Sequence, residues 1–228
     1  MKKIKFIIIG SGLAILSLVT AVSCEKSANT VGSDELASLK SVLTGYFEED
    51  GLSCVYLPEK FQEVTEEEIA MLNRMKEEEK LARDVYKALG EEWGIPVFNN
   101  ISSSEERHLQ AVLSLLRIYS PSDTIVPDAG VFSAPEVQDL YNELVAKGTA
   151  SLADALITGA TIEDLDIKDL SEYLDKTDNE YMEFVFSNIR RGSFNHMKAF
   201  TAHLRARGID YIPQFISQDL YDEIIGTE

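Results

Sequence analysis

The chain has 228 residues, of which 45% are hydrophobic, so it can bury an apolar core and whole-chain disorder is not expected. Its 39 Asp and Glu residues outnumber 21 Lys and Arg residues, for a formal charge of -18. This balance argues against nucleic acid as a partner, because phosphate binding needs a basic surface. The two cysteines are too few for a disulfide framework or a thiolate metal site.

Residues 1–23 have the pattern of a secretory signal peptide: three lysines precede an apolar run over residues 6–22, and small residues follow. An uncleaved membrane anchor is the alternative, since the run approaches the length that spans a bilayer. The run ends in Ala-Val-Ser-Cys, which resembles a bacterial lipobox. That resemblance implies cleavage before Cys24, lipidation of its thiol and attachment to a membrane outside the cytoplasm.

Residues 24–60 are predicted to form a tether between this anchor and the folded domain. Ser, Asn, Thr and Gly dominate residues 27–33, which is typical of a flexible linker. Leu36, Leu39 and Leu43 have helical spacing and allow one short helix. No residue pattern in this region indicates chemistry.

Residues 61–228 are predicted to form one all-α domain, because apolar residues recur there with the helical period and turn residues separate the periodic segments. The first helix should open with a capping box at Thr65, and the second with Ser102 or Ser103 as its cap. Long helices are expected over residues 65–90, 103–119, 151–174 and 179–207, a shorter one over 135–147, and a tail helix near 219–225. Four long amphipathic helices with a crossover segment predict a helix bundle.

Each long helix also carries residues that can bind a metal on its apolar stripe, where an amphipathic helix normally has only hydrophobic side chains. These residues are Glu79 in the first helix, Glu105 and His108 in the second, Glu163 and Asp166 in the third, and His196 in the fourth. The helical pattern places Glu78 almost as far inward as Glu79, so the pattern alone leaves that choice open.

Buried carboxylates of this kind need a partner. An unpaired carboxylate in a helix core costs several kcal/mol, so it is protonated, paired or bound to a cation. The Glu-x-x-His spacing of Glu105 and His108 puts both side chains on one face, where both can reach one metal ion. Any one of these residues alone is more often a solvated or satisfied side chain. Their joint occurrence, one set per helix, favours a divalent metal site.

Four segments, in the correct order, resemble DUF2202, a ferritin-like family classed as a domain of unknown function. They are EEEKLARDVY (77–86), SEERHLQAV (104–112), GATIEDLDIKDL (159–170) and RGSFNHMKAF (191–200). The resemblance implies a ferritin-like four-helix bundle with a crossover segment and short extra helices. It also relates the chain to the rubrerythrins, better-known members of that superfamily. A homodimer is a further possibility, since many ferritin-like proteins form one.

Rubrerythrins carry a first-helix Glu followed by Ala, Arg and Tyr at helical spacing. This chain matches that arrangement with Glu79, Ala82, Arg83 and Tyr86, which favours Glu79 over Glu78. Their second-helix pair is similar to Glu105 and His108, and their third-helix pair of carboxylates is similar to Glu163 and Asp166.

The fourth helix departs from the rubrerythrin pattern. Ser193 stands where rubrerythrins have a Glu three residues before His, and a serine hydroxyl is a poor ligand for a hard divalent ion. Asp166 can supply the missing carboxylate; otherwise the site is asymmetric, mononuclear or vestigial. The rubredoxin-like Cys module of rubrerythrins is also absent from the sequence.

Oxidative metal chemistry is therefore the first functional hypothesis. A pair of iron ions, or of manganese ions, would react with peroxide or dioxygen. The metal ligands would be Glu79, Glu105, His108, Glu163 and His196, with Asp166 as a further candidate. Arg83 can pair with a carboxylate that orients a ligand, and Tyr86 can act as a redox-active or hydrogen-bonding neighbour. The alternatives are a non-catalytic metal-binding lipoprotein and a purely structural or interaction module with a vestigial site.

Overall fold

The computed structural model describes residues 33–48, 62–120 and 125–226. The signal peptide, Cys24 and most of the expected tether lie outside these residues. Within them the chain is all-α, with seven helices and no strand, as the sequence predicts. The helices are α1 (Ser33–Glu48), α2 (Glu66–Trp93), α3 (Pro96–Tyr119), α4 (Pro135–Gly148), α5 (Leu152–Leu174), α6 (Glu180–Arg205) and α7 (Gln218–Ile225).

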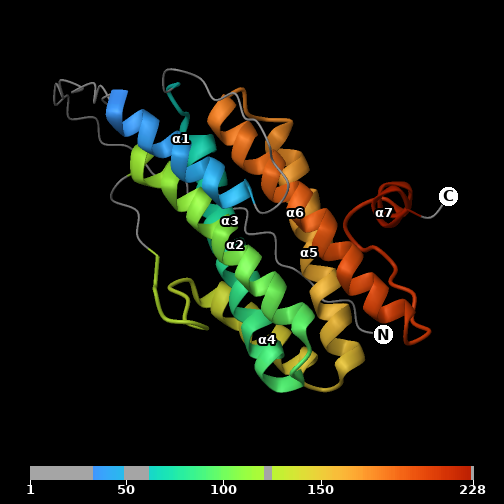
Figure 1. Cartoon of the computed structure of the whole chain (residues 1–228). Coiled ribbons are helices and arrows are strands. Elements are labelled where there is room, and N and C mark those ends of the chain that lie inside the picture. Colours follow the sequence, from blue (N-terminus) through green and yellow to red (C-terminus); the bar gives the residue numbers. More distant parts are fainter. Residues whose placement is uncertain (1–32, 49–61, 121–124, 227–228) are drawn as a thin grey trace, which may run out of the picture.

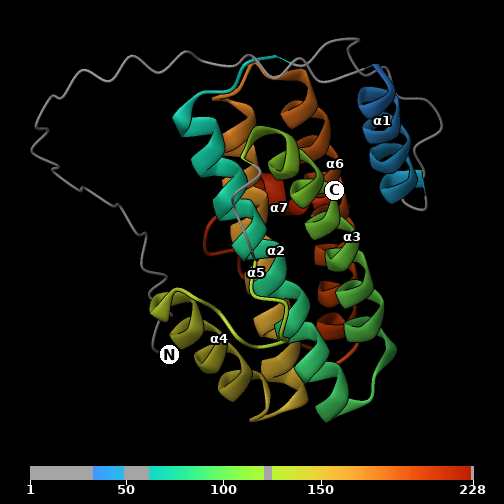
Figure 2. The ribbon, with the colours of Figure 1, turned by 90° about the vertical axis from the view of Figure 1, so that its left-hand side faces the viewer.

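The four long helices lie side by side as two antiparallel pairs (Figures 1 and 2). Helix α2 packs most extensively on α3, and α5 on α6, while contacts between α2 and α5 are fewer. Helix α4 lies at the end of the molecule where α2 turns into α3, and the indole Nε1 of Trp93 donates to the Gly148 carbonyl at 2.9 Å. This pairing of helices is consistent with a bundle whose two halves are joined by a crossover segment.

Local sequence signals set several helix ends. Thr65 caps α2 with a complete capping box, in which the Glu68 carboxylate accepts from the Thr65 backbone N–H at 2.8 Å. Gly94 ends the same helix in the left-handed conformation, with φ of 65°. Ser151 caps α5 and Asn179 caps α6 through their side-chain oxygens.

The predicted start of the second long helix is wrong. Helix α3 begins at Pro96, with Ile95 as its N-cap, and not at Ser102 or Ser103. Those two hydroxyls lie inside the helix and donate to the carbonyls of Arg83 and Asn99. Buried Val97, Phe98 and Ile101 hold this first part of the helix in the core, so tertiary packing outweighs the low helix propensity of its Asn and Ser residues.

The core consists of two apolar clusters stacked along the bundle. The first cluster contains Tyr86, Phe98 and Phe200, and the second contains Leu72, Leu115 and Val185 among others. On α2, α3 and α6, the polar residues predicted to face inward fall between the positions that contribute to the two clusters. On α5, Glu163 and Asp166 lie between Ile162 and Ile167 of the first cluster, and the second cluster begins at Leu170. The candidate site is therefore a polar layer between two apolar ones.

The smaller helices cover the ends and sides of the bundle. Helix α1 lies beside α3 (Figure 2), and its Leu39 and Leu43 are buried in the second apolar cluster. The segment after α6 packs against α5 through hydrogen bonds to buried Asp164. The Asp164 carboxylate accepts from the Tyr211 hydroxyl at 2.8 Å and from the Ile216 backbone N–H at 2.9 Å. None of the helices in the described part of the chain combines the length and apolar character needed to cross a bilayer.

Candidate metal centre

The polar layer contains a first group of three buried side chains, Glu79 from α2 and Glu105 and His108 from α3. The imidazole Nδ1 of His108 lies 2.8 Å from Oε2 of Glu105 and 3.4 Å from Oε2 of Glu79. One ligand atom from each residue lies within 4.8 Å of the other two. The Glu-x-x-His spacing on α3 thus brings both of its side chains to one point, and α2 adds a second carboxylate there.

A second group joins Glu105 to Glu163 from α5 and His196 from α6, again with all three ligand atoms within 4.8 Å of one another. Nδ1 of His196 lies 2.9 Å from Oε1 of Glu105 and 3.4 Å from Oε2 of Glu163, yet it makes no aligned hydrogen bond. The two groups share Glu105, and each of its oxygens faces a different histidine. The His108 and His196 rings stack with centroids 5.5 Å apart.

These contacts form a set that can hold a metal ion. All five side chains are buried, and Oε1 of Glu79 has no hydrogen-bond partner. Two ligands that bind one metal ion at right angles, each about 2.1 Å from it, are about 3 Å apart, which matches the closest oxygen–nitrogen distances in both groups. Because burying such atoms without a partner is costly, a bound cation would relieve the cost.

The pKa values of two acids in the layer show that their ionisation is unfavourable there. Burial raises the pKa of Glu79 well above its usual value, and the charges of Asp166 and Glu105 add to the rise. Burial followed by the charge of Glu105 raises the pKa of Glu163 to about 7, although His196 and Tyr86 oppose it. These acids therefore retain protons that a metal ion can displace.

Glu105 and His196 behave in the opposite way. Burial would raise the pKa of Glu105, but the charges of His196 and His108 outweigh it and hold that pKa well below the usual value. Burial would lower the pKa of His196, but Glu105 and Glu163 raise it well above the usual value. Glu105 is thus the ionised carboxylate at the centre of the layer, between two imidazoles.

Asp166 and Ser193 meet at the edge of the layer. The Ser193 hydroxyl lies 2.5 Å from Oδ2 of Asp166, to which it donates, and 3.0 Å from the Ile189 carbonyl. The other oxygen of Asp166, Oδ1, is buried without a hydrogen-bond partner. Asp166 is absent from both three-residue groups but lines the cavity that borders them. Ser193, three residues before His196 on α6, therefore contacts a carboxylate of α5.

Tyr86 and Arg83 lie in different surroundings. The Tyr86 hydroxyl is fully buried and donates to Oε1 of Glu163 at 2.5 Å, so it contacts the layer directly. Arg83 is bonded instead to Asp84 at 2.8 Å and to Glu106 at 2.6 Å. Neither carboxylate belongs to the two groups, so the structure does not bring Arg83 together with the other predicted site residues.

Two further residues border the layer, and the sequence pattern did not single out their roles. A Cβ at Gly192 would lie 2.7 Å from Cε1 and Nε2 of His108, so the glycine makes room for that ring. Glu78 lines the bordering cavity, with one buried oxygen that has no hydrogen-bond partner. The one available signal for Gly192 was a glycine inside a long helix, which is costly without a packing reason.

Comparisons with known proteins agree on one family. The family model described as an uncharacterized protein domain, DUF2202, matches residues 68–228. The chain belongs to the DUF2202 family. A protein from Methanocaldococcus jannaschii described as uncharacterized protein MJ0754 is 50% identical over 167 residues, which is 73% of this chain and 90% of that protein.

A solved structure gives the same relationship in three dimensions. The crystal structure of the hypothetical protein MJ0754 from Methanococcus jannaschii superposes with a TM-score of 0.72 at 48% identity. The match covers 76% of this chain and 99% of that chain. Neither description names an activity, so the function has to be argued from the site.

Proposed function

We propose that the polar layer is a ferritin-like metal centre for two divalent ions, which share Glu105 as a bridging ligand. The observation that supports this most directly is the position of Glu105, whose two oxygens lie 2.8 and 2.9 Å from the Nδ1 atoms of two different histidines. Glu79 completes one ion's set and Glu163 the other's. Inward carboxylates and imidazoles from four helices form such sites in di-iron bundles.

Iron is the metal that we favour, with manganese as the nearest alternative. The set holds three carboxylates and two imidazoles, and Asp166 adds a further carboxylate at its edge. Such an oxygen-rich set suits iron and manganese better than zinc, whose structural sites are rich in thiolate or imidazole. When bound, an iron pair supplies two electrons, which with two protons reduce hydrogen peroxide to two water molecules.

The chain's own residues would support this chemistry by binding and by proton handling. The two apolar clusters exclude water from both sides of the layer. Tyr86 holds Oε1 of Glu163 and so leaves Oε2, the oxygen nearer His196, directed at the second group. Glu79 and Glu163, whose pKa values are raised, retain protons to higher pH than ordinary carboxyl groups do, and metal binding would release those protons.

The experiment that tests the metal centre is an Fe(II) titration of the purified protein under anaerobic conditions, with elemental analysis and an optical spectrum. We expect two ions per chain, and fewer than two in Glu105→Gln, because the amide keeps the volume but removes the shared anionic ligand. Glu92→Gln, at an exposed position of the same protein, is the matched control and should keep two. A folded wild-type protein with no affinity for Fe(II) or Mn(II) would refute the proposal.

Metal storage or sequestration without turnover is the second candidate, and the observation in its favour is Ser193. This residue contacts Asp166 and stands where the resembling rubrerythrins have a Glu, so one carboxylate of their pattern is missing. Peroxide-driven oxidation of the bound Fe(II) separates the two candidates. One peroxide consumed per two ferrous ions supports oxidative chemistry, whereas bound iron that peroxide oxidises no faster than iron in buffer supports storage.

We also propose, from the sequence, that the mature protein is exported and anchored to a bacterial membrane by a lipid on Cys24. A Cys24→Ser variant should remain unprocessed or move to the soluble fraction, whereas Cys54→Ser should fractionate as the wild type does. Equal membrane association of both variants would contradict a lipid anchor and favour an uncleaved apolar leader.

A further inference from the structure

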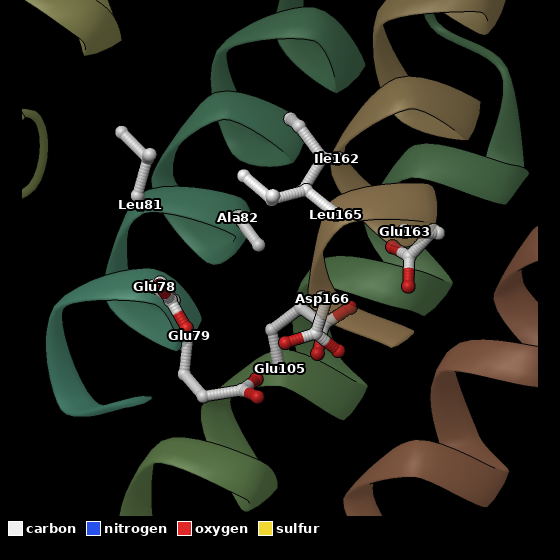
Figure 3. A pocket seen from close by; sticks show the side chains of 9 residues that line it. All are labelled: Glu78, Glu79, Leu81, Ala82, Glu105, Ile162, Glu163, Leu165 and Asp166. Atoms are coloured by element: carbon white, nitrogen blue, oxygen red, sulfur yellow. The ribbon is translucent and has the colours of Figure 1, made fainter. Parts of the chain in front are cut away.

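A small cavity leads to the candidate metal centre along the line where α2 and α5 meet (Figure 3). Four hydrocarbon side chains line one part of it: Leu81 and Ala82 from α2, and Ile162 and Leu165 from α5. Carboxylates line the other part, among them Glu79, Glu105 and Glu163 of the two candidate ligand groups. The cavity thus places hydrocarbon side chains directly beside the proposed ligands. Its half-buried lining residues are Leu165, Glu78 and Asp166.

The loose contact between the two helix pairs leaves room for this cavity. Helix α2 packs closely on α3 and α5 closely on α6, whereas α2 and α5 touch less extensively. The cavity is only partly enclosed, and Leu165 is only half-buried beside it. A molecule can therefore reach the carboxylates along this line without separating the more tightly packed pairs.

The size of the cavity limits what can use it. Its volume is about 30 Å³, whereas roughly 10–15 Å³ on the same measure is enough for one water molecule. About two water-sized molecules, or one molecule of two heavy atoms, fill it. An organic hydroperoxide with a branched or aromatic substituent does not fit unless the side chains move.

The chemistry of the lining also limits which molecules can enter the cavity. Most of the lining surface is hydrocarbon, which gives a charged molecule no replacement for its hydration shell. The ionised carboxylate of Glu105 in the lining repels anions as well. An uncharged small molecule loses no ionic hydration shell in the cavity and is not repelled by the carboxylate.

We propose that this cavity is the access route for a small uncharged oxidant of two heavy atoms, and that Ala82 and Leu165 determine its size limit. The proposal rests on the proposed function, because it takes the polar layer to be the place where the oxidant reacts. Ala82 is the smallest side chain in the lining and comes one turn after Glu79 on α2. A larger side chain at position 82 would fill the cavity next to the proposed ligands.

The first test uses metal-free protein and does not depend on activity. Xenon is apolar, binds small hydrocarbon cavities and is easily located in crystals. Crystals of the wild type under xenon pressure should show an atom beside Ala82 and Leu165. The Ala82→Leu variant should show none there, because three added carbon atoms occupy the space. The absence of xenon in the wild type would overturn the proposal.

The second test uses Fe(II)-loaded protein and compares hydrogen peroxide with cumene hydroperoxide. The wild type should be oxidised rapidly by hydrogen peroxide and slowly by the bulky reagent. Ala82→Leu should slow oxidation by hydrogen peroxide by about tenfold or more while keeping the wild-type iron content. The control is Ala146→Leu, the same change at an exposed position of α4, and it should have no effect.

The two proposals fail in different ways. Xenon beside Ala82 together with no metal affinity would refute the metal centre and leave an apolar cavity of unknown use. Normal metal content with an unchanged oxidation rate in Ala82→Leu would refute the access route alone. If Ala82→Leu does not fold, Leu165→Phe closes the same cavity from α5 and takes its place in both tests.

Discussion

The polar layer and the apolar clusters beside it occupy the same four helices, yet they are stabilised in different ways. In the second cluster, fully buried side chains such as Leu72 and Val185 are satisfied by packing alone. In the layer, acids and imidazoles meet at 2.8 to 3.4 Å, and several of their polar atoms have no aligned partner. The comparison shows that one region is satisfied by contacts within the chain, whereas the other keeps buried acids and imidazoles that could hold a metal ion.

The largest expected effect comes from disrupting the apolar region. Leu72→Ala should lower the free energy of unfolding by about 2–5 kcal/mol, because it leaves a cavity among fully buried neighbours. The isosteric change Glu79→Gln should leave the stability of the metal-free protein unchanged or raise it, since it removes a buried acid whose Oε1 has no partner. Denaturant unfolding of both metal-free variants measures the contrast. A larger loss in Glu79→Gln than in Leu72→Ala would contradict it.

Metal binding should stabilise the polar layer and leave the apolar clusters unchanged. Fe(II) or Mn(II) at about 30 times the dissociation constant of each site should stabilise the folded protein by about 4 kcal/mol, which is about 2 kcal/mol for each of the two ions. The gain should be smaller in Glu105→Gln and persist in Leu72→Ala, because only the first variant changes the ligands. Thermal unfolding with and without metal measures it. An equal gain in both variants would mean that the metal binds elsewhere.

The metal-free protein should lose stability as the pH rises from about 5 to about 8. The pKa of Glu163 is raised to about 7, so its carboxyl is increasingly forced to ionise in the folded state as pH passes from its unfolded pKa toward 7. The raised pKa of His196 acts with the same sign, because its stabilising charge is lost as pH rises from 6.5 through the folded value. Glu163 alone should account for a loss on the order of 2 kcal/mol over this pH range, and His196 adds to it.

Metal reverses the sign of this dependence, since the ligands bind it in their deprotonated forms. Unfolding measured at several pH values, with chelator and with metal, tests both slopes. A metal-free stability that increases between pH 5 and 8 would contradict the description of the layer.

The smallest expected effect concerns the room that the helices leave for His108. Gly192→Ala would put a methyl group 2.7 Å from the His108 ring, so the ring must move away from its carboxylate partners. We expect about tenfold weaker metal binding with the fold retained, which is the lower end of the range for changes next to metal ligands. Gly45→Ala in α1, where nothing lies within 4 Å of the added carbon, is the matched control. Equal affinities in the two variants would show that Gly192 has no role in the site.

Much of the fold could be predicted from local signals in the sequence. The capping box at Thr65 and the apolar period that follows it are local properties, and the structure contains both. The start of α3 could not be predicted in this way, because Asn and Ser residues with low helix propensity are held helical by Phe98 and Ile101 in the core. The position of Pro96 at the first turn was the available signal for that start.

The candidate site also has features that the sequence predicts and features that it does not. The 3.6-residue period alone indicated that Glu105, His108, Glu163 and His196 face inward, and the structure brings them together with Glu79. The same period could not separate Glu79 from Glu78, because the centre of the apolar stripe falls between the two positions, which are about 100° apart around the helix. It also could not indicate that Arg83 pairs with Glu106, since that contact depends on the side of α2 that faces α3.

The sequence by itself determined that the chain forms long amphipathic helices with inward acids and histidines, because helical periodicity and capping are encoded within a few residues. Only the tertiary structure decided that one glutamate lies between two histidines, that Ser193 contacts Asp166, and that a cavity follows the line between α2 and α5. These features depend on how far apart the helices pack and how each is rotated about its axis. No single helix carries that information.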